Sequence, residues 1–336
     1  MNALTYPDRC TFARHDWEIL SQYWHPVART ESVAADRPLG TRLLDVNLVV
    51  YRLEERLIVA LDRCPHRGTR LSLGTLSRGR LICPYHGLEF DGRGVCTRIP
   101  GDPHAGRIPD RFSIPTCLAE ERYGLIWVCL SGAPTTPIPD WAVLEQIGNQ
   151  RCSMHAIWKT SPARHVENFN DLAHFATVHA GTFGSREQPI VKPYTVETRP
   201  HGLYFDAVVP IFDGATFEAN PVYRDLDTEY EVTFPFATRL TLHYSNGVEH
   251  ICDVASPMSA GTSQIFILKS RDHDQDQSAD DWFRFQDAIN EEDRVMVESQ
   301  EPVTVPLERG VEWHIASDGF SVAYRKHWAA LGMSAV

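Results

Sequence analysis

The sequence predicts an α+β protein of two domains, an all-β domain followed by a domain with an antiparallel sheet and flanking helices. Three observations predict this fold class. Short runs of alternating apolar and polar residues, broken by glycine and proline, dominate residues 38–132. Longer strand-like runs fill residues 194–270, and helix-like segments lie on both sides of them. A chain of 336 residues is long enough for two hydrophobic cores.

The N-terminal domain is expected over residues 1–135. Residues 41–63 read as two strands joined by a turn at Glu54 and Glu55, and residues 121–130 read as one further strand. The stretch SGAPTTPIPDW that follows is rich in proline and glycine, which is typical of a linker. The second domain is therefore expected over residues 136–336.

Helix signals mark both sides of the second domain's predicted sheet. Ser161 followed by Pro162 is a typical helix start, and a second helix is expected after Ser278. Between them, four runs rich in β-branched and aromatic residues predict the antiparallel strands.

Two cysteines and two histidines lie in two short motifs, C-P-H-R-G and C-P-Y-H-G. Cys64 and His66 are separated by one residue, and Cys83 and His86 by two, whereas zinc sites usually leave at least two residues between paired ligands. A [2Fe–2S] cluster with two thiolates on one iron and two imidazoles on the other explains this mixture better. A structural zinc site is the alternative.

A second metal site is indicated by Asp171, His174 and His179. Asp171 and His174 are three residues apart and would share a helix face, but His179 would lie about 140° further round from His174. A bulge or a helix end is therefore predicted between Ala176 and His179. Two histidines and one carboxylate form the ligand set of non-haem Fe(II) oxygen chemistry.

The downstream helix supplies a candidate for the carboxylate. Its inward face is predicted to be the row Trp282, Phe285, Ile289, Asp293 and Met296. Asp293 is the one charge in this row, and a buried carboxylate needs a cation or a metal, so Asp293 is predicted to be the third ligand. The alternative is a slightly rotated helix with Asp293 in solvent. Glu291 and Glu292 fall off the row.

Together these motifs resemble those of the Rieske non-haem iron oxygenases, and the similarity extends to EEDRVMVESQEP and SVAYRKHW near the C-terminus. The small members of that family include caffeine N-demethylases, vanillate-type O-demethylases and alkaloid hydroxylases. The resemblance implies a terminal oxygenase that uses O2 for monooxygenation, by hydroxylation or oxidative N- or O-demethylation, of a small alkaloid or aromatic substrate. A cis-dihydroxylating aromatic-ring dioxygenase is one alternative, and a Rieske electron carrier without oxygenase activity is another.

The resemblance also implies a role for Asp171 and a set of partners. In the family, the corresponding aspartate links an iron-ligand histidine to a cluster histidine of the neighbouring subunit in a head-to-tail trimer. Carried over, Asp171 would join His174 to His86 of another chain. Electrons would come from a separate NAD(P)H-dependent reductase or ferredoxin, because the sequence has no G-x-G-x-x-G unit and no P-loop.

The composition and charge of the chain indicate its kind of partner and its cellular location. A net charge of −12 argues against general nucleic-acid binding, and no apolar run reaches the length of a membrane span. The cysteines outside the cluster motifs lack framework spacing, which predicts reduced thiols and a cytoplasmic protein. Nine arginines against four acids in residues 63–111 would suit an acidic electron donor. The substrate pocket is expected near residues 180–195 and 211–226, with sheet candidates Phe234, Phe236, Leu240 and Tyr244.

Overall fold

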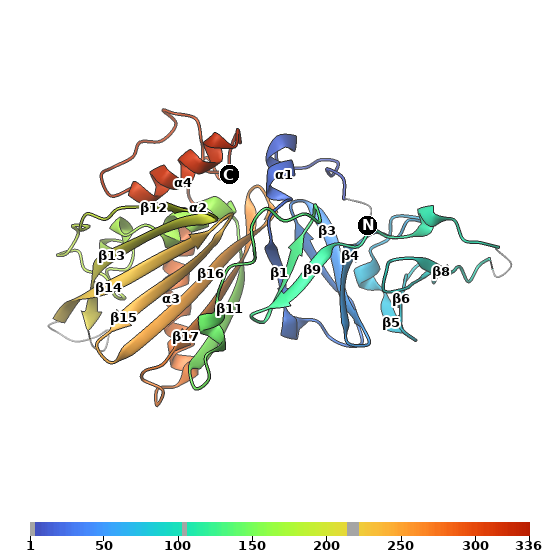
Figure 1. The fold of residues 1–336 in the computed structure, drawn as a ribbon, viewed down its shortest axis with the longest axis horizontal. Helices are drawn as coiled ribbons and strands as arrows, with labels where there is room; N and C mark the ends of the chain where they lie inside the picture. Colours follow the sequence, from blue (N-terminus) through green and yellow to red (C-terminus); the bar gives the residue numbers. More distant parts are fainter. Residues whose placement is uncertain (1–3, 103–105, 214–221) are drawn as a thin grey trace. The chain divides into compact units, whose positions relative to one another are not determined.

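The chain divides into two compact units, Met1–Ile138 and Pro139–Val336 (Figure 1). The computed structural model describes residues 4–102, 106–213 and 222–336. The division falls inside the proline-rich stretch that the sequence predicts as a linker. Among the described residues, no helix is both long and apolar enough to cross a membrane.

Within its described residues, the first unit contains three small antiparallel sheets and short helices. The sheets are β1 (His25–Arg29), β10 (Leu125–Cys129) and β9 (Leu118–Arg122); β2 (Leu39–Leu43), β3 (Val46–Leu53) and β4 (Arg56–Leu61); and β5 (Thr75–Ser77), β6 (Arg80–Ile82), β7 (Glu89–Phe90) and β8 (Cys96–Arg98). The helices are α1 (Arg14–Leu20) and the 3-10 turns η1 (Thr30–Ser32), η2 (Leu71–Leu73) and η3 (Asp110–Phe112).

Left-handed turns set the strand boundaries of this unit. Glu54 has φ 55° and turns the chain between β3 and β4, so the predicted hairpin is confirmed. The prediction of one strand over residues 121–130 is wrong, because Tyr123 (φ 57°) and Gly124 (φ 74°) form a turn between β9 and β10. A tyrosine at a positive φ is uncommon, which is why the apolar pattern alone concealed this turn.

The second unit is built on one seven-stranded antiparallel sheet. Its order is β11 (Gln150–Trp158), β17 (Thr262–Arg271), β16 (Gly247–Ser259), β15 (Ala237–Tyr244), β14 (Val222–Thr233), β13 (Gly202–Asp213) and β12 (Glu197–Arg199). The other elements are α2 (Pro162–Phe169), α3 (Ala279–Val297), α4 (Gly319–Ala330), η4 (Ala142–Glu145) and η5 (Ala173–Ala176). The predicted antiparallel sheet with flanking helices is confirmed.

Helices α3 and α4 cover the same face of this sheet. Cross-strand partners share a face, and the register places Phe205, Tyr230, Leu240, Ile251 and Lys269 in one row across β13 to β17. At one end of the row, the ring centroids of Phe205 and Phe320 of α4 are 5.8 Å apart. At the other end, the Lys269 ammonium lies 4.6 Å from the centre of the Trp282 ring of α3.

Helix α3 begins as predicted, but the side of the helix that faces the sheet is not the predicted row of residues. The Ser278 hydroxyl accepts a hydrogen bond from the Asp280 N–H and caps the helix. Trp282 and Gln286 are buried, whereas Phe285 and Met296 are 39% and 44% exposed, so the predicted inward row is wrong at these two positions. A glutamine takes an inward position because it has a buried partner in the sheet.

That partner is Lys269, which fixes α3 through a buried polar contact. Its Nζ lies 2.7 Å from Glu249 Oε1 and 2.9 Å from Gln286 Oε1, and the lysine and the glutamate are both buried. A buried charge pair of this kind resists separation, because removal of either partner leaves the other without compensation.

We expect Lys269→Met to lower the free energy of unfolding by about 3–5 kcal/mol, because it leaves the buried Glu249 carboxylate without its cation. Equilibrium denaturation of the whole chain would measure the loss. The double variant Lys269→Met/Glu249→Leu should recover most of it. A double variant as unstable as the single one would contradict this account of the pair.

Candidate metal centres

The two cysteine–histidine motifs fold into two loops of the same geometry. In the first loop, the Gly68 N–H donates to the Cys64 carbonyl at 2.9 Å, and in the second the Gly87 N–H donates to the Cys83 carbonyl at 3.1 Å. Both glycines have a positive φ, of 74° and 70°. Each loop therefore closes on a left-handed glycine, a conformation that other residues adopt only with strain.

The two cysteine side chains of the loops lie together, and so do the two histidine side chains. Cys64 and Cys83 are each 2% exposed and belong to the core beneath the loops. Burial and the neighbouring Cys83 thiol raise the pKa of Cys64 to about 11. His66 and His86 are exposed, with their Nδ1 atoms 3.1 Å apart.

This pairing fits a two-iron cluster better than a single zinc ion. Two nitrogens on one tetrahedral metal, with bonds of about 2.1 Å, lie about 3.4 Å apart. A zinc ion would bring all four ligand atoms equally close. The four loop residues do not form such a group. Among the described residues, the only set of three or more His, Cys, Asp or Glu side chains whose ligand atoms all lie within 4.8 Å of one another is His174, His179 and Asp293.

The segment that carries those histidines is not one continuous helix. Helix α2 ends at Phe169, and η5 ends at Ala176, before His179. The predicted helix end between Ala176 and His179 is confirmed. The assumption that Asp171 and His174 share a regular helix is wrong, because Asp171 precedes η5 and its Oδ1 accepts the Ala173 N–H at 2.8 Å.

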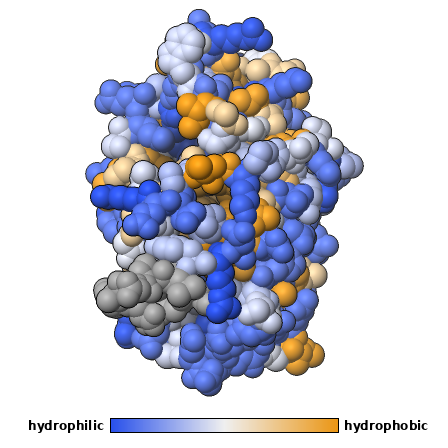
Figure 2. Space-filling view, turned by 90° about the vertical axis from the view of Figure 1, so that its left-hand side faces the viewer, coloured by the Kyte–Doolittle hydropathy of each residue, from blue (hydrophilic) through white to orange (hydrophobic). Residues whose placement is uncertain are grey.

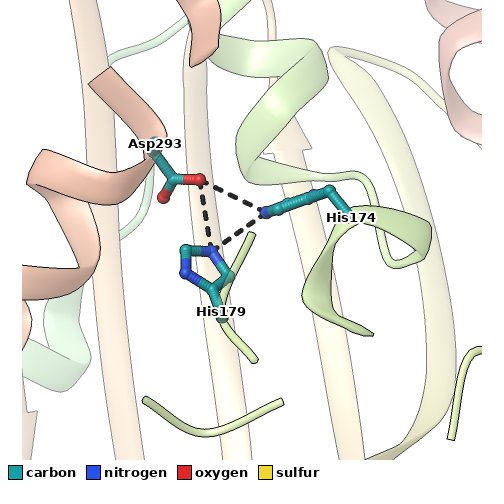
Figure 3. A group of neighbouring side chains, drawn as sticks. All are labelled: His174, His179 and Asp293. Carbon is teal, nitrogen blue, oxygen red and sulfur yellow. Dashed lines mark hydrogen bonds and ion pairs between the residues drawn. The ribbon is translucent and has the colours of Figure 1, made fainter. Parts of the chain in front are cut away.

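Three side chains from two separate parts of the chain converge on one point (Figure 3). His174 Nε2 and His179 Nε2 are 3.1 Å apart, and Asp293 Oδ1 lies 3.3 Å from the first and 3.2 Å from the second. Metal bonds of about 2.1 Å place neighbouring ligands about 3.0 Å apart in an octahedron and about 3.4 Å apart in a tetrahedron. The triangle has the size of one face of either polyhedron and therefore fits a metal ion.

Each histidine of this triangle has a carboxylate behind it. Asp171 Oδ2 lies 3.2 Å from His174 Nδ1, and Glu292 Oε2 lies 2.7 Å from His179 Nδ1. Burial alone would lower the pKa of His174, but Asp171 and Asp293, which face its two ring nitrogens, raise it to about 9. A cation held by the triangle would take the place of the proton that His174 otherwise binds.

Asp293 receives a further hydrogen bond. Burial would raise its pKa, but hydrogen bonds from His174 and His179 hold the pKa well below its usual range. The Asn168 amide donates to Asp293 Oδ1 at 3.1 Å, so the last turn of α2 also orients this oxygen.

Asn168 and Glu292 were not predicted as part of the metal site, and Glu292 fell off the predicted inward row of the helix. Glu292 lies beside Asp293 in the sequence and Asn168 lies six residues before His174, but no spacing rule connects either residue to a partner more than a hundred residues away. Two of the aromatic pocket candidates belong to the packing of α4 instead. Phe234 and Phe236 lie 5.4 Å and 6.1 Å from Trp328, measured between ring centroids.

A small, mostly apolar pocket adjoins η5. It is lined by Leu172, Phe175 and Ala176, by Gly184 and Ser185, by residues 188–191 and by residues 208–210 of β13. This placement agrees with the expectation for residues 180–195. The second expected border, residues 211–226, lies partly outside the described residues.

Models of protein families match both units. The Rieske [2Fe–2S] domain matches residues 23–113, and the vanillate O-demethylase oxygenase C-terminal domain matches residues 158–333. An iron–sulfur domain followed by a domain with a second metal site defines a class of two-centre redox enzymes.

Known proteins match nearly the whole chain. The methylxanthine N1-demethylase of Pseudomonas putida is 32% identical over 92% of this chain and 88% of its own, and the N3-demethylase of the same organism is 31% identical over 96% and 92%. The solved N1-demethylase structure with caffeine has a TM-score of 0.84 at 29% identity, covering 93% and 91% of the two chains. This chain belongs to the Rieske non-haem iron oxygenases.

Membership of the family confirms several predictions from the sequence. The protein is a monooxygenase that carries a Rieske [2Fe–2S] cluster and a mononuclear iron. It is the oxygenase component of a system with a separate electron donor, and it acts on a small organic substrate. The electron-carrier and zinc alternatives are thereby set aside.

We expect Gly184→Ala to weaken binding of the mononuclear metal by about tenfold, because the new Cβ would lie 1.9 Å from the Phe175 carbonyl oxygen. The Gly184 N–H donates to the His179 carbonyl at 2.9 Å, so a shift of this glycine moves the histidine. Metal analysis would measure the loss, with the visible absorption of the cluster as an internal reference. The control is Gly181→Ala, whose Cβ meets nothing within 4 Å; equal metal content in both variants would contradict the prediction.

Proposed function

We propose that this protein is an oxidative demethylase that removes a methyl group from nitrogen or oxygen of a small aromatic or alkaloid compound. The observation that carries the proposal is the His174–His179–Asp293 triangle, in a chain whose full-length relatives are methylxanthine N-demethylases. If the oxygen atom is inserted at a carbon that is not bonded to nitrogen or oxygen, the product is a stable alcohol and the reaction is a hydroxylation.

The proposal assigns the metal ligands residue by residue. Cys64 and Cys83 would hold the inner iron of the cluster, and His66 and His86 the outer iron, in keeping with the buried thiols and the exposed imidazoles. His174, His179 and Asp293 would hold the mononuclear iron. When bound, this iron supplies the dioxygen chemistry that inserts one oxygen atom into a C–H bond.

The products follow from the chemistry of the substrate. An N-methyl group, one O2, two electrons and two protons give an N-hydroxymethyl group and one water. The N-hydroxymethyl compound then expels formaldehyde and leaves an N–H group, so that carbon and oxygen balance. The pocket beside η5 has an apolar lining that includes Leu172, Phe175 and Val209, which suits a flat and largely apolar compound.

Asp171 is proposed as the electron link between subunits. Its side chain is 32% exposed while its Oδ2 faces His174, so the carboxylate can accept one further hydrogen bond from outside. His86 turns Nδ1 toward His66, which leaves its Nε2–H for an outside acceptor. A head-to-tail homotrimer would bring His86 of one copy to Asp171 of the next.

The surface supports assembly with other copies. Trp313, Ile190 and Ile315 of the second unit are 87%, 82% and 65% exposed, and large exposed apolar side chains are typical of surfaces that a partner covers. Figure 2 shows one face on which hydrophobic residues gather in a central patch among hydrophilic ones. All eight cysteines are free, which supports the proposed cytoplasmic location.

Purified protein, a surrogate reductase and a panel of N-methyl, O-methyl and unmethylated heterocycles test the function. We expect formaldehyde and the demethylated product in equal amounts for each O2 consumed, with N-methyl compounds turned over fastest. A product that keeps its methyl group and gains two atoms from labelled dioxygen would instead establish the ring-dihydroxylating alternative.

For Asp171→Ala we expect both metal centres to be retained and coupled turnover to fall by about 100-fold, because the proposed link between centres is cut. Metal analysis would establish the loading, and reoxidation of the pre-reduced cluster by O2 with substrate would report the transfer between centres. Glu187→Gln, on the exposed loop after His179, is the control. Normal reoxidation in Asp171→Ala would refute the role of Asp171 as the link.

A further inference from the structure

Glu292 connects α3 to the loop that carries His179. One of its carboxylate oxygens, Oε2, lies 2.7 Å from His179 Nδ1, and the other accepts the Thr182 hydroxyl at 2.5 Å. The His179 ring is 1% exposed, whereas Glu292 is 33% exposed. Glu292 is also the residue immediately before Asp293, so two consecutive acids of one helix reach the same metal site.

We propose that Glu292 is the positioning residue of His179: it holds the imidazole in the tautomer and orientation that direct Nε2 at the metal. The inference rests on the proposed assignment of His174, His179 and Asp293 as metal ligands. A carboxylate accepts hydrogen bonds only, so His179 Nδ1 must carry a proton, and a metal ion held in the triangle would take the lone pair of Nε2. Nε2 faces into the triangle, 3.1 Å from His174 Nε2 and 3.2 Å from Asp293 Oδ1.

The surroundings leave Glu292 free for this role. The basic residue nearest to it along α3, Arg294, pairs with Glu291 and Glu298 instead. The Glu292 charge is therefore directed at the His179 N–H, which makes the ring a more basic ligand. The Thr182 hydroxyl occupies the remaining oxygen and keeps the carboxylate in this orientation.

Glu292 and Asp171 perform different tasks although each holds one histidine. Asp171 is proposed to reach a second copy of the chain, whereas both Glu292 oxygens bind groups of its own unit. Loss of Glu292 should therefore weaken metal binding. Loss of Asp171 should leave metal binding intact and slow electron transfer between loaded centres.

The experiment measures the dissociation constant of Fe(II) or Co(II) at the mononuclear site of the whole protein, with the cluster already assembled. We expect Glu292→Gln to weaken binding by about 10-fold and Glu292→Ala by up to about 100-fold. Thr182→Val should weaken it by a smaller factor, and Thr182→Ser should leave it unchanged. The matched control is Glu291→Gln, one residue away and paired with Arg294, which should bind metal as the unaltered protein does.

A second readout separates positioning from a general structural effect. In the Co(II) protein, the His179 Nδ1–H should give a paramagnetically shifted, solvent-exchangeable proton signal. This signal should move in Glu292→Gln and vanish in Glu292→Ala while remaining in Glu291→Gln.

Two results would overturn the inference, and they can be told apart. Unchanged metal affinity and an unmoved proton signal in the Glu292 variants, in a protein where His179→Ala abolishes binding, would refute the role of Glu292 alone. Unchanged metal binding in His179→Ala itself would refute the ligand assignment and, with it, the positioning of His179.

Discussion

The second unit depends on one geometric constraint: three ligand atoms from distant parts of the chain must meet within 3.3 Å. His174 and His179 lie on a short turn after α2, and Asp293 lies on α3. Polar contacts fix both supports: Lys269 of β17 binds Gln286 of α3, and on α2 Arg164 pairs with Glu312 and Glu167 with Arg325. Lys269, Arg164 and Glu167 are buried, so a shift of either helix would break a contact of a buried charged side chain.

Charge explains why this triangle favours a cation. Asp293 contributes one negative charge at the triangle itself, and Asp171 and Glu292 contribute one each behind the histidines. Asp171 and Asp293, which face the two ring nitrogens of His174, raise its pKa to about 9. The proposals divide these charges between two tasks: Glu292 would orient His179 for the metal, and Asp171 would serve the link to another copy.

The sequence predicted His174, His179 and Asp293 as one group, and the structure brings their side chains together; ligand chemistry restricts residue type and spacing enough to make such a group visible. It placed Asp293 on the inward side of α3 even though Phe285 and Met296 of the same predicted row are exposed. The row was predicted wrongly because a pattern of apolar residues does not identify a buried glutamine. Gln286 is buried because Lys269 of the sheet binds it. Glu292 was dismissed for a related reason: its partner approaches from a loop 113 residues earlier, and no local pattern encodes that contact.

The cluster loops and the His174–His179–Asp293 triangle expose different chemical groups, and this difference matters for the proposed electron transfer between them. At the cluster loops the thiols are buried and the imidazoles are exposed. At the triangle His179 is buried, and the carboxylates beside the two histidines, Asp171 and Glu292, are partly exposed, at 32% and 33%. An imidazole N–H donates and a carboxylate accepts, so Asp171 beside His174 has the chemistry that the proposed link to His86 of another copy requires. In the proposed head-to-tail assembly, each copy would supply His86 to one neighbour and Asp171 to another.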